Sequence, residues 1–236
     1  MRAVFLDRDG VINDVVYYPE IGLVDSPFTV EQFHLRPRVG EAIQRLNRLQ
    51  FKVIVVSNQP GIAKRHFSAR TLAAMDRKMK RSLARQGARL DAALYCLHHP
   101  GAALKRYRLR CACRKPQPGL LLQAATDFGI DLERSYMVGD SASDVQAGQR
   151  AGCRTIYLGS WKCDVCRLME RQGVRPHFIC QDLWEASRQI QALEGGDGDF
   201  SRFRRREGDS KVGRPGGGGW RHHQPFHSLQ RQGLRN

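Results

Sequence analysis

The sequence predicts one α/β domain, a Rossmann-like parallel sheet with helices packed on both of its faces. Short apolar runs alternate along the chain with amphipathic stretches of helical period, a pattern typical of strand–helix–strand units. Polar clusters follow several of the apolar runs, at the strand ends where ligands bind in such sheets. The length of 236 residues and the apolar content of 41% suit a domain of about 150–200 residues plus an extension.

The individual elements follow from this alternation. The predicted strands are Ala3–Leu6, Phe51–Val56, Leu90–Cys96, Ser135–Val138, Thr155–Leu158 and His177–Ile179. The predicted helices are Val39–Leu49, Ser68–Arg85, Pro118–Phe128, Ser143–Ala151, Cys163–Arg171 and Leu183–Leu193. Since a helix separates most successive strands, the strands are expected to run parallel, with both faces of the sheet covered.

Two aspartates stand at the end of the first predicted strand, in the segment VFLDRDGVIN (residues 4–13). Residues two apart in an extended chain point to the same side, so Asp7 and Asp9 can converge while Gly10 lets the backbone turn. Two carboxylates this close repel each other unless a cation lies between them or one is protonated. The alternative is a turn at Asp9–Gly10, with Asp7 capping the strand.

Further polar residues follow later strands. Ser57, Asn58 and Gln59 come after the second strand, Asp140 follows the fourth, and Lys115 lies in CRKPQPG. Taken one at a time, the polar residues could be ordinary turn residues, and Lys115 could be an ordinary surface lysine. Together, the Ser57 hydroxyl and the Asn58 N–H can bind a phosphoryl oxygen, and Lys115 can balance its charge.

This set of groups fits phosphoryl transfer. Asp7 can attack phosphorus and form an acyl phosphate. Asp9 can protonate the leaving alkoxide and later deprotonate the attacking water. Asp140 can complete an all-oxygen magnesium site with Asp7 and a main-chain carbonyl, which offsets the repulsion between carboxylates and phosphate.

Four segments in this order, LDRDGVIN, VVSNQPGIAKRHF, CRKPQPG and YMVGDSASDVQAG, resemble the motifs of haloacid dehalogenase-type phosphatases. Within that family, residues 2–160 are most similar to the D-glycero-D-manno-heptose 1,7-bisphosphate 7-phosphatases and the related histidinol-phosphate phosphatases. The resemblance implies magnesium-dependent removal of the 7-phosphate through an aspartyl phosphate. Such an enzyme would serve ADP- or GDP-heptose and lipopolysaccharide core synthesis.

The resemblance also implies a role for individual residues. Asp7 would be the nucleophile, Asp9 the acid and base, and Ser57 and Lys115 the catalytic groups that stabilise the phosphoryl group. The implied magnesium ligands are Asp7, Asp9 and Asp140. The implied substrate-binding residues are Asp7, Arg8, Asp9, Ser57, Asn58, Gln59, Arg114 and Lys115. Arg114 would contact the distal part of the substrate, and residues 15–18 would border the pocket.

A second metal site is predicted from Cys96-x-His98 and Cys111-x-Cys113. Three thiolates and one imidazole without a carboxylate suit a structural, tetrahedral Zn²⁺. The loop PGAALKRYRLR between the two pairs lacks an apolar core, so a metal is a plausible means of ordering it. Buried free cysteines, or a redox dithiol at Cys111 and Cys113, are the alternatives.

The zinc loop immediately precedes Arg114 and Lys115, so it is expected to fix both cations against the substrate. A large cap domain is not expected, because no long insertion follows the first or second motif. The roof of the site would then consist of short loops. Cys163-x-x-Cys166 lacks a second ligand pair, and an ordinary helical pair is its simpler reading.

The net charge of +16 favours anionic ligands, and its distribution does not single out nucleic acid. Basic residues are spread over predicted helices and loops without interleaved aromatic residues. Residues 195–236 hold nine Lys/Arg against four Asp/Glu and ten glycines, which predicts a disordered tail after a domain of residues 1–194. A nucleic-acid-binding arm is the alternative for this tail.

These observations lead to a set of expectations about biology. The substrate is a phosphorylated sugar, the chain is a monomer, and nucleic acid is not its partner. No apolar stretch approaches the roughly 18 residues of a membrane span and the start does not resemble a signal peptide, so we expect a cytoplasmic enzyme. The alternatives are histidinol-phosphate phosphatase activity and a non-catalytic, zinc-containing nucleic-acid-binding protein.

Overall fold

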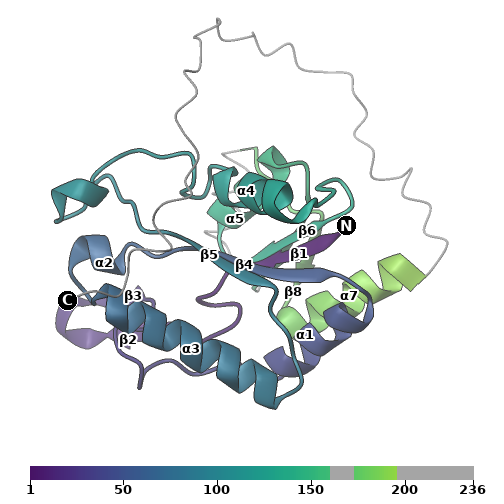
Figure 1. Cartoon of the computed structure of the whole chain (residues 1–236), viewed down its shortest axis with the longest axis horizontal. Helices are drawn as coiled ribbons and strands as arrows, with labels where there is room; N and C mark the ends of the chain where they lie inside the picture. Colours follow the sequence, from purple (N-terminus) through teal and green to yellow (C-terminus); the bar gives the residue numbers. More distant parts are fainter. Residues whose placement is uncertain (160–172, 196–236) are drawn as a thin grey trace, which may run out of the picture. The chain divides into compact units, whose positions relative to one another are not determined.

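A six-stranded parallel sheet forms the centre of the computed structural model, which describes residues 1–159 and 173–195 (Figure 1). Its strand order is β5-β4-β1-β6-β7-β8. The strands are β1 (Ala3–Leu6), β4 (Lys52–Asn58), β5 (Ala92–Cys96), β6 (Tyr136–Gly139), β7 (Arg154–Leu158) and β8 (Phe178–Cys180). All their pairings are parallel, which confirms the predicted fold class.

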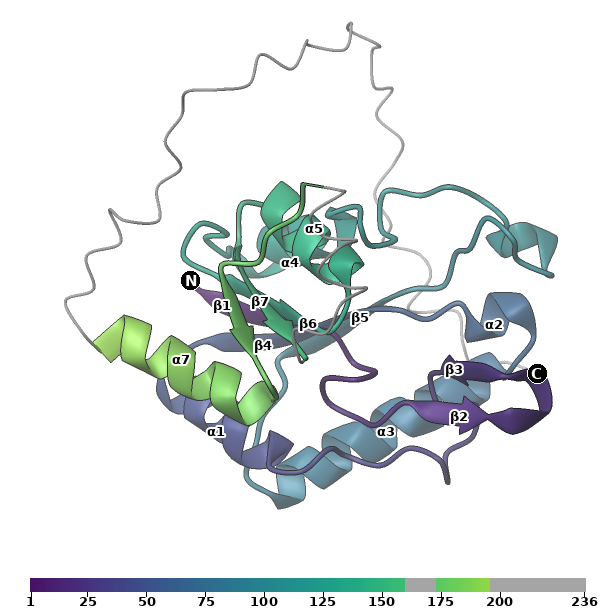
Figure 2. The same cartoon turned by 180° about the vertical axis from the view of Figure 1, so that it is seen from behind.

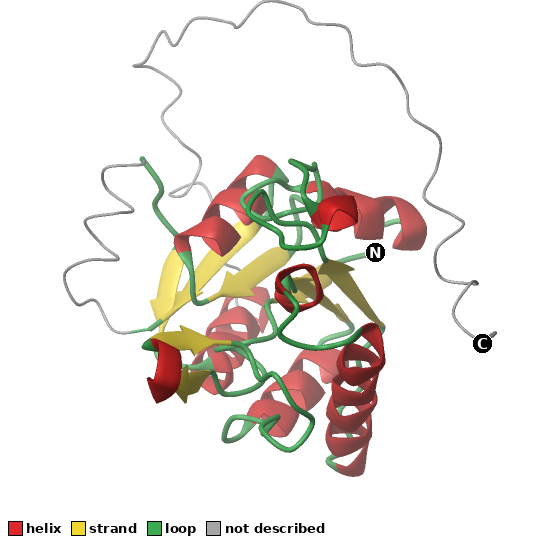
Figure 3. Ribbon diagram, turned by 90° about the vertical axis from the view of Figure 1, so that its left-hand side faces the viewer, coloured by secondary structure: helices red, strands yellow, loops and turns green. Residues whose placement is uncertain are grey.

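Helices cover both faces of this sheet, as the views from opposite sides show (Figures 1 and 2). One face carries α1 (Val39–Arg48), α3 (Ala69–Arg85) and α7 (Leu183–Gly195). The other face carries α4 (Gly119–Phe128) and α5 (Ala142–Arg150). Figure 3 shows the same layering from the side, with the sheet between two layers of helices.

The side-chain alternation of the central strands produces these two cores. Val4 and Leu6 of β1 belong to one buried cluster, together with side chains of α1, α3 and α7. Ala3 and Phe5 belong to the other, together with Leu121 and further residues of α4 and α5. Successive residues of a strand point to opposite faces, so a fully apolar strand is needed where both faces are buried.

Most predicted elements are confirmed, with shifted ends. The second central strand continues to Asn58, beyond the predicted end at Val56, because Ser57 and Asn58 still pair with Tyr95 and Cys96 of β5. The helix predicted from Ser68 begins at Ala69, since the Ser68 side chain accepts a hydrogen bond from the Thr71 N–H and serves as the N-cap.

A small antiparallel hairpin lies between residues 16 and 25, where the sequence predicted neither a strand nor a helix. It consists of β2 (Val16–Tyr18), the 3₁₀ turn η1 (Pro19–Ile21) and β3 (Leu23–Asp25). The Tyr18 ring stacks on Phe28 with 4.1 Å between centroids, and Phe28 meets His66 edge-on just after α2 (Gly61–Lys64). These rings join the hairpin to the segment that follows β4.

The loop between the two Cys/His pairs has little regular structure, and several predictions concern residues that the structure does not describe. The loop between Cys96-x-His98 and Cys111-x-Cys113 contains only the short 3₁₀ turn η2 (Lys105–Tyr107). The predicted helix Cys163–Arg171, the pair Cys163 and Cys166, and the tail from residue 196 onward lie outside the described residues. Within residues 1–159 and 173–195, no helix is long and apolar enough to cross a membrane.

Candidate active site

Three carboxylates gather where β1 and β6 end. The candidate ligand oxygens of Asp7, Asp140 and Asp144 all lie within 4.8 Å of one another. Asp7 directly follows β1, and its N–H donates to the carbonyl of Val138 in β6 at 3.0 Å. Asp140 follows β6, and Asp144 lies in the first turn of α5. Neighbouring parallel strands thus bring residues from distant parts of the sequence together.

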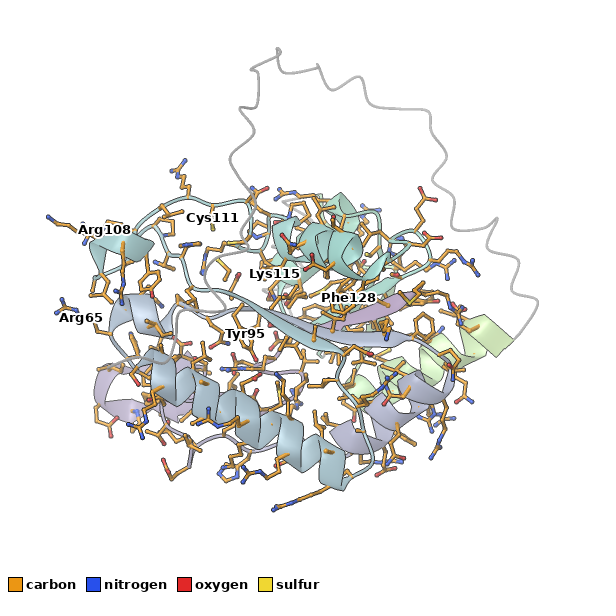
Figure 4. All side chains as sticks on the ribbon, viewed as in Figure 1. Arg65, Tyr95, Arg108, Cys111, Lys115 and Phe128 are labelled. Carbon is orange, nitrogen blue, oxygen red and sulfur yellow. The ribbon has the colours of Figure 1, made fainter. Side chains whose placement is uncertain are left out.

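Lys115 lies among these carboxylates with only 3% of its surface exposed (Figure 4). Its Nζ is 2.9 Å from Asp7 Oδ1 and 2.5 Å from Asp144 Oδ1, and it donates to the carbonyl of Val56 at 2.8 Å. Burial acts to lower the pKa of Lys115, but Asp144 and Asp7 outweigh it and hold the pKa above its ordinary value. The ammonium group is therefore permanently charged.

Asn58 fixes the backbone of Lys115 at the sheet edge. Its side-chain Nδ2 donates to the Lys115 carbonyl at 3.0 Å, and its Oδ1 accepts from the Lys115 N–H at 3.0 Å. Sequence reasoning assigned the Asn58 backbone to a phosphoryl oxygen and did not foresee this side-chain role. The paired contacts hold the start of the Lys115 side chain in one position relative to β4.

Asp144 was quoted within the fourth motif but received no role from the sequence. It is fully buried, and its Oδ2 accepts from the Ser141 N–H at 3.0 Å and from the Ser141 hydroxyl at 2.6 Å. Gly139 makes room for it, since a Cβ there would lie 2.2 Å from the Asp144 Cβ. The spacing of four residues from Asp140 was the available signal, because it places both side chains at the start of one helix.

The charges of this cluster do not balance without a cation. With all three carboxylates ionised, the one ammonium leaves a net charge of −2, and with one carboxyl protonated the net charge is still −1. Burial, Asp7 and Asp144 together raise the pKa of Asp140 to about 8, so the charged form of this carboxyl is disfavoured in the cluster. A hard divalent cation with oxygen ligands would relieve this cost, and the donor set fits Mg²⁺.

Asp9 lies outside this carboxylate group and faces a different set of partners. The fork of the Arg8 guanidinium contacts its carboxylate at 3.0 to 3.2 Å. Asn13 donates to its Oδ1 at 2.9 Å and Gln59 to its Oδ2 at 2.5 Å. The third carboxylate beside Asp7 and Asp140 is that of Asp144, and the predicted role of Asp9 as a magnesium ligand stays a prediction.

The other predicted substrate-binding residues divide into two groups. The side chains of Arg8 and Gln59 are fully buried, and Ser57 has only 2% of its surface exposed. Arg114 is partly exposed, and its Nη1 donates to the carbonyl of His98 at 3.2 Å. A substrate can thus reach the Arg114 guanidinium, whereas the Arg8 guanidinium is enclosed by protein.

The predicted zinc ligands Cys96, His98, Cys111 and Cys113 form one tight cluster. Their sulfur atoms are 3.2 to 3.6 Å apart, and His98 Nδ1 is 3.3 Å from Cys113 Sγ and 3.8 Å from Cys96 Sγ. A tetrahedral Zn²⁺ with bonds of about 2.3 Å has ligand separations of about 3.8 Å, so the cluster suits this ion. Hydrogen bonding from Cys113 holds the pKa of Cys96 below its ordinary value, which favours a thiolate.

The chain was compared with known proteins. A family model described as HAD-hydrolase-like matches residues 112–186, which include Lys115, Asp140 and Asp144. The D-glycero-beta-D-manno-heptose-1,7-bisphosphate 7-phosphatase of Rhodopseudomonas palustris is 41% identical over 150 residues, 64% of this chain and 79% of the relative. The enzyme of the same name from Escherichia coli K12 is 40% identical over 157 residues, 66% of this chain and 78% of the relative. The chain belongs to the HAD-like phosphatases.

Solved structures of HAD-like phosphatases have the same architecture. The D,D-heptose 1,7-bisphosphate phosphatase of B. bronchiseptica, complexed with magnesium and phosphate, matches 81% of this chain and 99% of its own. Its TM-score is 0.65 at 32% sequence identity. A putative HAD-like phosphatase from Mesorhizobium loti gives a TM-score of 0.67 at 31% identity, over 84% of this chain and 89% of its own. The family resemblance predicted from the motifs is therefore confirmed.

Gly10 permits the close approach of Asp140 in this HAD-like phosphatase. A Cβ at Gly10, whose φ is +78°, would lie 1.8 Å from Asp140 Oδ2. We predict that Gly10→Ala displaces Asp140 and abolishes phosphatase activity, besides costing the roughly 1–2 kcal/mol of a left-handed non-glycine residue. Urea unfolding and an activity assay measure the two effects.

Gly129→Ala is the matched control. Gly129 also has a positive φ, +61°, but nothing lies within 4 Å of the added Cβ. This variant is expected to lose about 1–2 kcal/mol of stability and to keep its activity. Equal activity in the two variants would contradict the role of Gly10 in placing Asp140.

Proposed function

We propose that this protein is a magnesium-dependent phosphatase that removes the 7-phosphate from D-glycero-β-D-manno-heptose 1,7-bisphosphate. The observation that carries the proposal is the placement of Lys115 between Asp7 and Asp144, in a chain about 40% identical to enzymes of that name. The β anomer follows the names of those relatives. The activity would serve nucleotide-activated heptose and lipopolysaccharide core synthesis, in the cytoplasm and as a monomer.

Asp7 is the proposed nucleophile. One of its carboxylate oxygens attacks the phosphorus of the 7-phosphate, the bond from phosphorus to the sugar oxygen breaks, and an aspartyl phosphate forms. Lys115 contacts Asp7 directly, so its charge lies beside the oxygen that attacks. Ser57, which accepts from Gln59 at 3.2 Å, would use its hydroxyl hydrogen to bind a phosphoryl oxygen.

Asp9 is the proposed acid and base. It donates a proton to the sugar oxygen as that oxygen leaves, and it then takes a proton from the water that attacks the aspartyl phosphate. Inorganic phosphate and the free Asp7 carboxylate result. Asp7, Asp140 and the Asp9 main-chain carbonyl would hold Mg²⁺, with Asp144 beside them. When bound, the ion neutralises phosphate charge and lowers the repulsion that the incoming substrate meets.

Zn²⁺ bound by the four-residue cluster is proposed to have a structural role. Cys111 and Cys113 immediately precede Arg114 and Lys115 in the chain. Arg114 donates to the carbonyl of the ligand His98, which ties this guanidinium to the metal loop. We propose that Arg114 binds the anomeric phosphate, since its fork can engage two phosphate oxygens at once.

Two alternative functions fit the observations less well. Histidinol phosphate carries a cationic amine and an imidazole at the end where the partly exposed Arg114 would meet it, so charge disfavours it. A zinc-containing nucleic-acid-binding protein would need aromatic residues beside the metal loop for stacking. Tyr95 instead packs in the core with its hydroxyl bonded to Asp76. Tyr107 is the one aromatic residue within the loop, and its half-buried ring packs against the same core and lies next to His98 and the Arg106 guanidinium.

The substrate proposal is tested with purified protein, Mg²⁺ and a panel of phosphate esters. The panel comprises both anomers of heptose 1,7-bisphosphate, histidinol phosphate and fructose 1,6-bisphosphate. We expect the highest kcat/KM for the β-heptose bisphosphate, with release of one phosphate per molecule. A preference for histidinol phosphate would contradict the substrate and leave the phosphatase mechanism standing.

We predict that catalytic turnover and zinc binding can be lost independently of each other. Asp7→Asn removes the nucleophile, so it should abolish turnover while the purified protein keeps one Zn²⁺. Cys111→Ser should lose the Zn²⁺ and lower the stability of the metal loop. Steady-state assays and elemental analysis of the same preparations measure both properties.

Cys153→Ala serves as the control for the cysteine substitution. Cys153 is buried against α4 and α5 and is not a member of the cluster, so its variant should keep zinc. Substantial turnover by Asp7→Asn would disprove the nucleophile assignment. Unchanged zinc content in Cys111→Ser would disprove the ligand set.

A further inference from the structure

Arg8 stands at the end of β1 and points away from the carboxylate cluster. It continues the row of Val4 and Leu6, so its side chain enters the layer of α1 and α3, whereas Asp7 points to the opposite face. The Arg8 side chain has no exposed surface. Its guanidinium lies between the rings of Phe33 and Tyr95, 6.0 and 5.8 Å from their centroids. Figure 4 shows Tyr95 on this side of the sheet.

Burying a guanidinium here is costly. Its Nη1 has no hydrogen-bond partner among the described residues, and buried unsatisfied polar atoms cost roughly 1–3 kcal/mol. A buried ion pair is in general weak evidence for stabilisation of a fold. The hydrogen bonds that the Arg8 guanidinium does make go to two acceptors, Asp9 and Gln59 Oε1, the latter at 2.9 Å.

Gln59 connects the same groups from the end of β4. It is fully buried, its Oε1 accepts from Arg8, and its Nε2 donates to Asp9 Oδ2 at 2.5 Å and to Ser57 Oγ at 3.2 Å. Its own N–H donates to the carbonyl of Cys96 at 2.7 Å, which anchors it to β5. One amide thus links the orientation of Asp9 to that of Ser57.

We propose that Arg8 and Gln59 are positioning residues, which hold the Asp9 carboxylate in the orientation needed for proton transfer and do not contact the substrate. This inference rests on the proposed phosphatase mechanism. Arg8 Nε and Nη2, Asn13 Nδ2 and Gln59 Nε2 together fix both Asp9 oxygens. The Asp9 carboxylate can keep all of these hydrogen bonds in only one orientation.

A comparison of two substrates with different leaving groups distinguishes a role of Arg8 and Gln59 in positioning Asp9 from a general structural role. An alkyl phosphate such as the heptose bisphosphate releases an alkoxide, which needs a proton as the bond to phosphorus breaks. The p-nitrophenyl phosphate ester releases nitrophenolate, a stable anion that leaves without a proton. Loss of Asp9 positioning should therefore slow the first turnover of the alkyl ester and spare that of the aryl ester.

The experiment follows the first turnover by rapid quench with both esters, for wild type, Arg8→Met and Gln59→Leu. The alkyl ester is the most rapidly hydrolysed member of the substrate panel. We expect its first turnover to slow by at least tenfold, as part of the roughly 10²–10⁴-fold that the whole proton transfer contributes. The nitrophenolate burst should keep its wild-type rate, while steady-state turnover of the aryl ester falls because water attack still needs Asp9.

Two further variants complete the design. Arg8→Lys keeps the charge but not the fork, so it should recover part of the alkyl-ester rate. Tyr95→Phe is the matched control, because it keeps the ring beside Arg8, removes only the hydroxyl bonded to Asp76 and does not touch Asp9, so it should leave the ratio of the two first-turnover rates unchanged. If Arg8→Met does not fold, the neutral and similarly sized Gln59→Leu provides the same comparison.

Equal slowing of both esters in Arg8→Met and Gln59→Leu would overturn the inference and indicate a structural role. A raised KM with unchanged first-turnover rates would also overturn the inference, because it would indicate that Arg8 and Gln59 bind the substrate. A different observation would contradict the proposed function, namely that the wild-type protein forms no aspartyl phosphate. The identity of the alkyl substrate does not affect the comparison.

Discussion

The ammonium group of Lys115 between Asp7 and Asp144 is the contact on which the site depends. It brings together the end of β1, the start of α5 and the segment that precedes α4. Each participant has its own support: Asn58 holds the Lys115 backbone and Ser141 holds the Asp144 carboxylate. Because the lysine is buried, neither carboxylate can be moved without leaving its charge unpaired.

The contact of Lys115 with Asp7 and Asp144 also explains why a bound cation would stabilise the carboxylate cluster. Lys115 balances one of the three carboxylates, and Asp140 is left beside charges of its own sign. Gly10 and Gly139 allow the backbone to approach so closely that side chains at these positions would collide with Asp140 and Asp144. The fold therefore concentrates negative charge at the strand ends, and the incoming phosphate adds more unless a divalent ion is bound.

The sequence predicted the parts of this arrangement that depend on local pattern. Alternating strands and helices determined the sheet, and the motifs located Asp7, Ser57 and Asp140 at strand ends and Lys115 after the loop that carries the four Cys and His residues. It did not predict the contacts that individual side chains make, such as those of Asn58 with the Lys115 backbone. The hairpin β2–β3 was missed because its strands have three residues each and are held by Tyr18 and Phe28, which no period reveals.

Arg8 shows both the reach and the limit of sequence reasoning. Its place after Val4 and Leu6 implies, by simple alternation, that it points to the opposite face from Asp7. The family resemblance nevertheless implied that Arg8 binds the substrate. Only the three-dimensional contacts with Asp9, Gln59, Phe33 and Tyr95 show that it is enclosed.

The most direct test of the charge imbalance is the unfolding free energy of wild type and Asp140→Asn, each with EDTA and with Mg²⁺ at neutral pH. If the three carboxylates repel one another, the metal-free variant should be more stable than the metal-free wild type. Mg²⁺ should stabilise the wild type and have little effect on the variant. A wild type that is insensitive to Mg²⁺, or a metal-free variant that is less stable than wild type, would contradict this account.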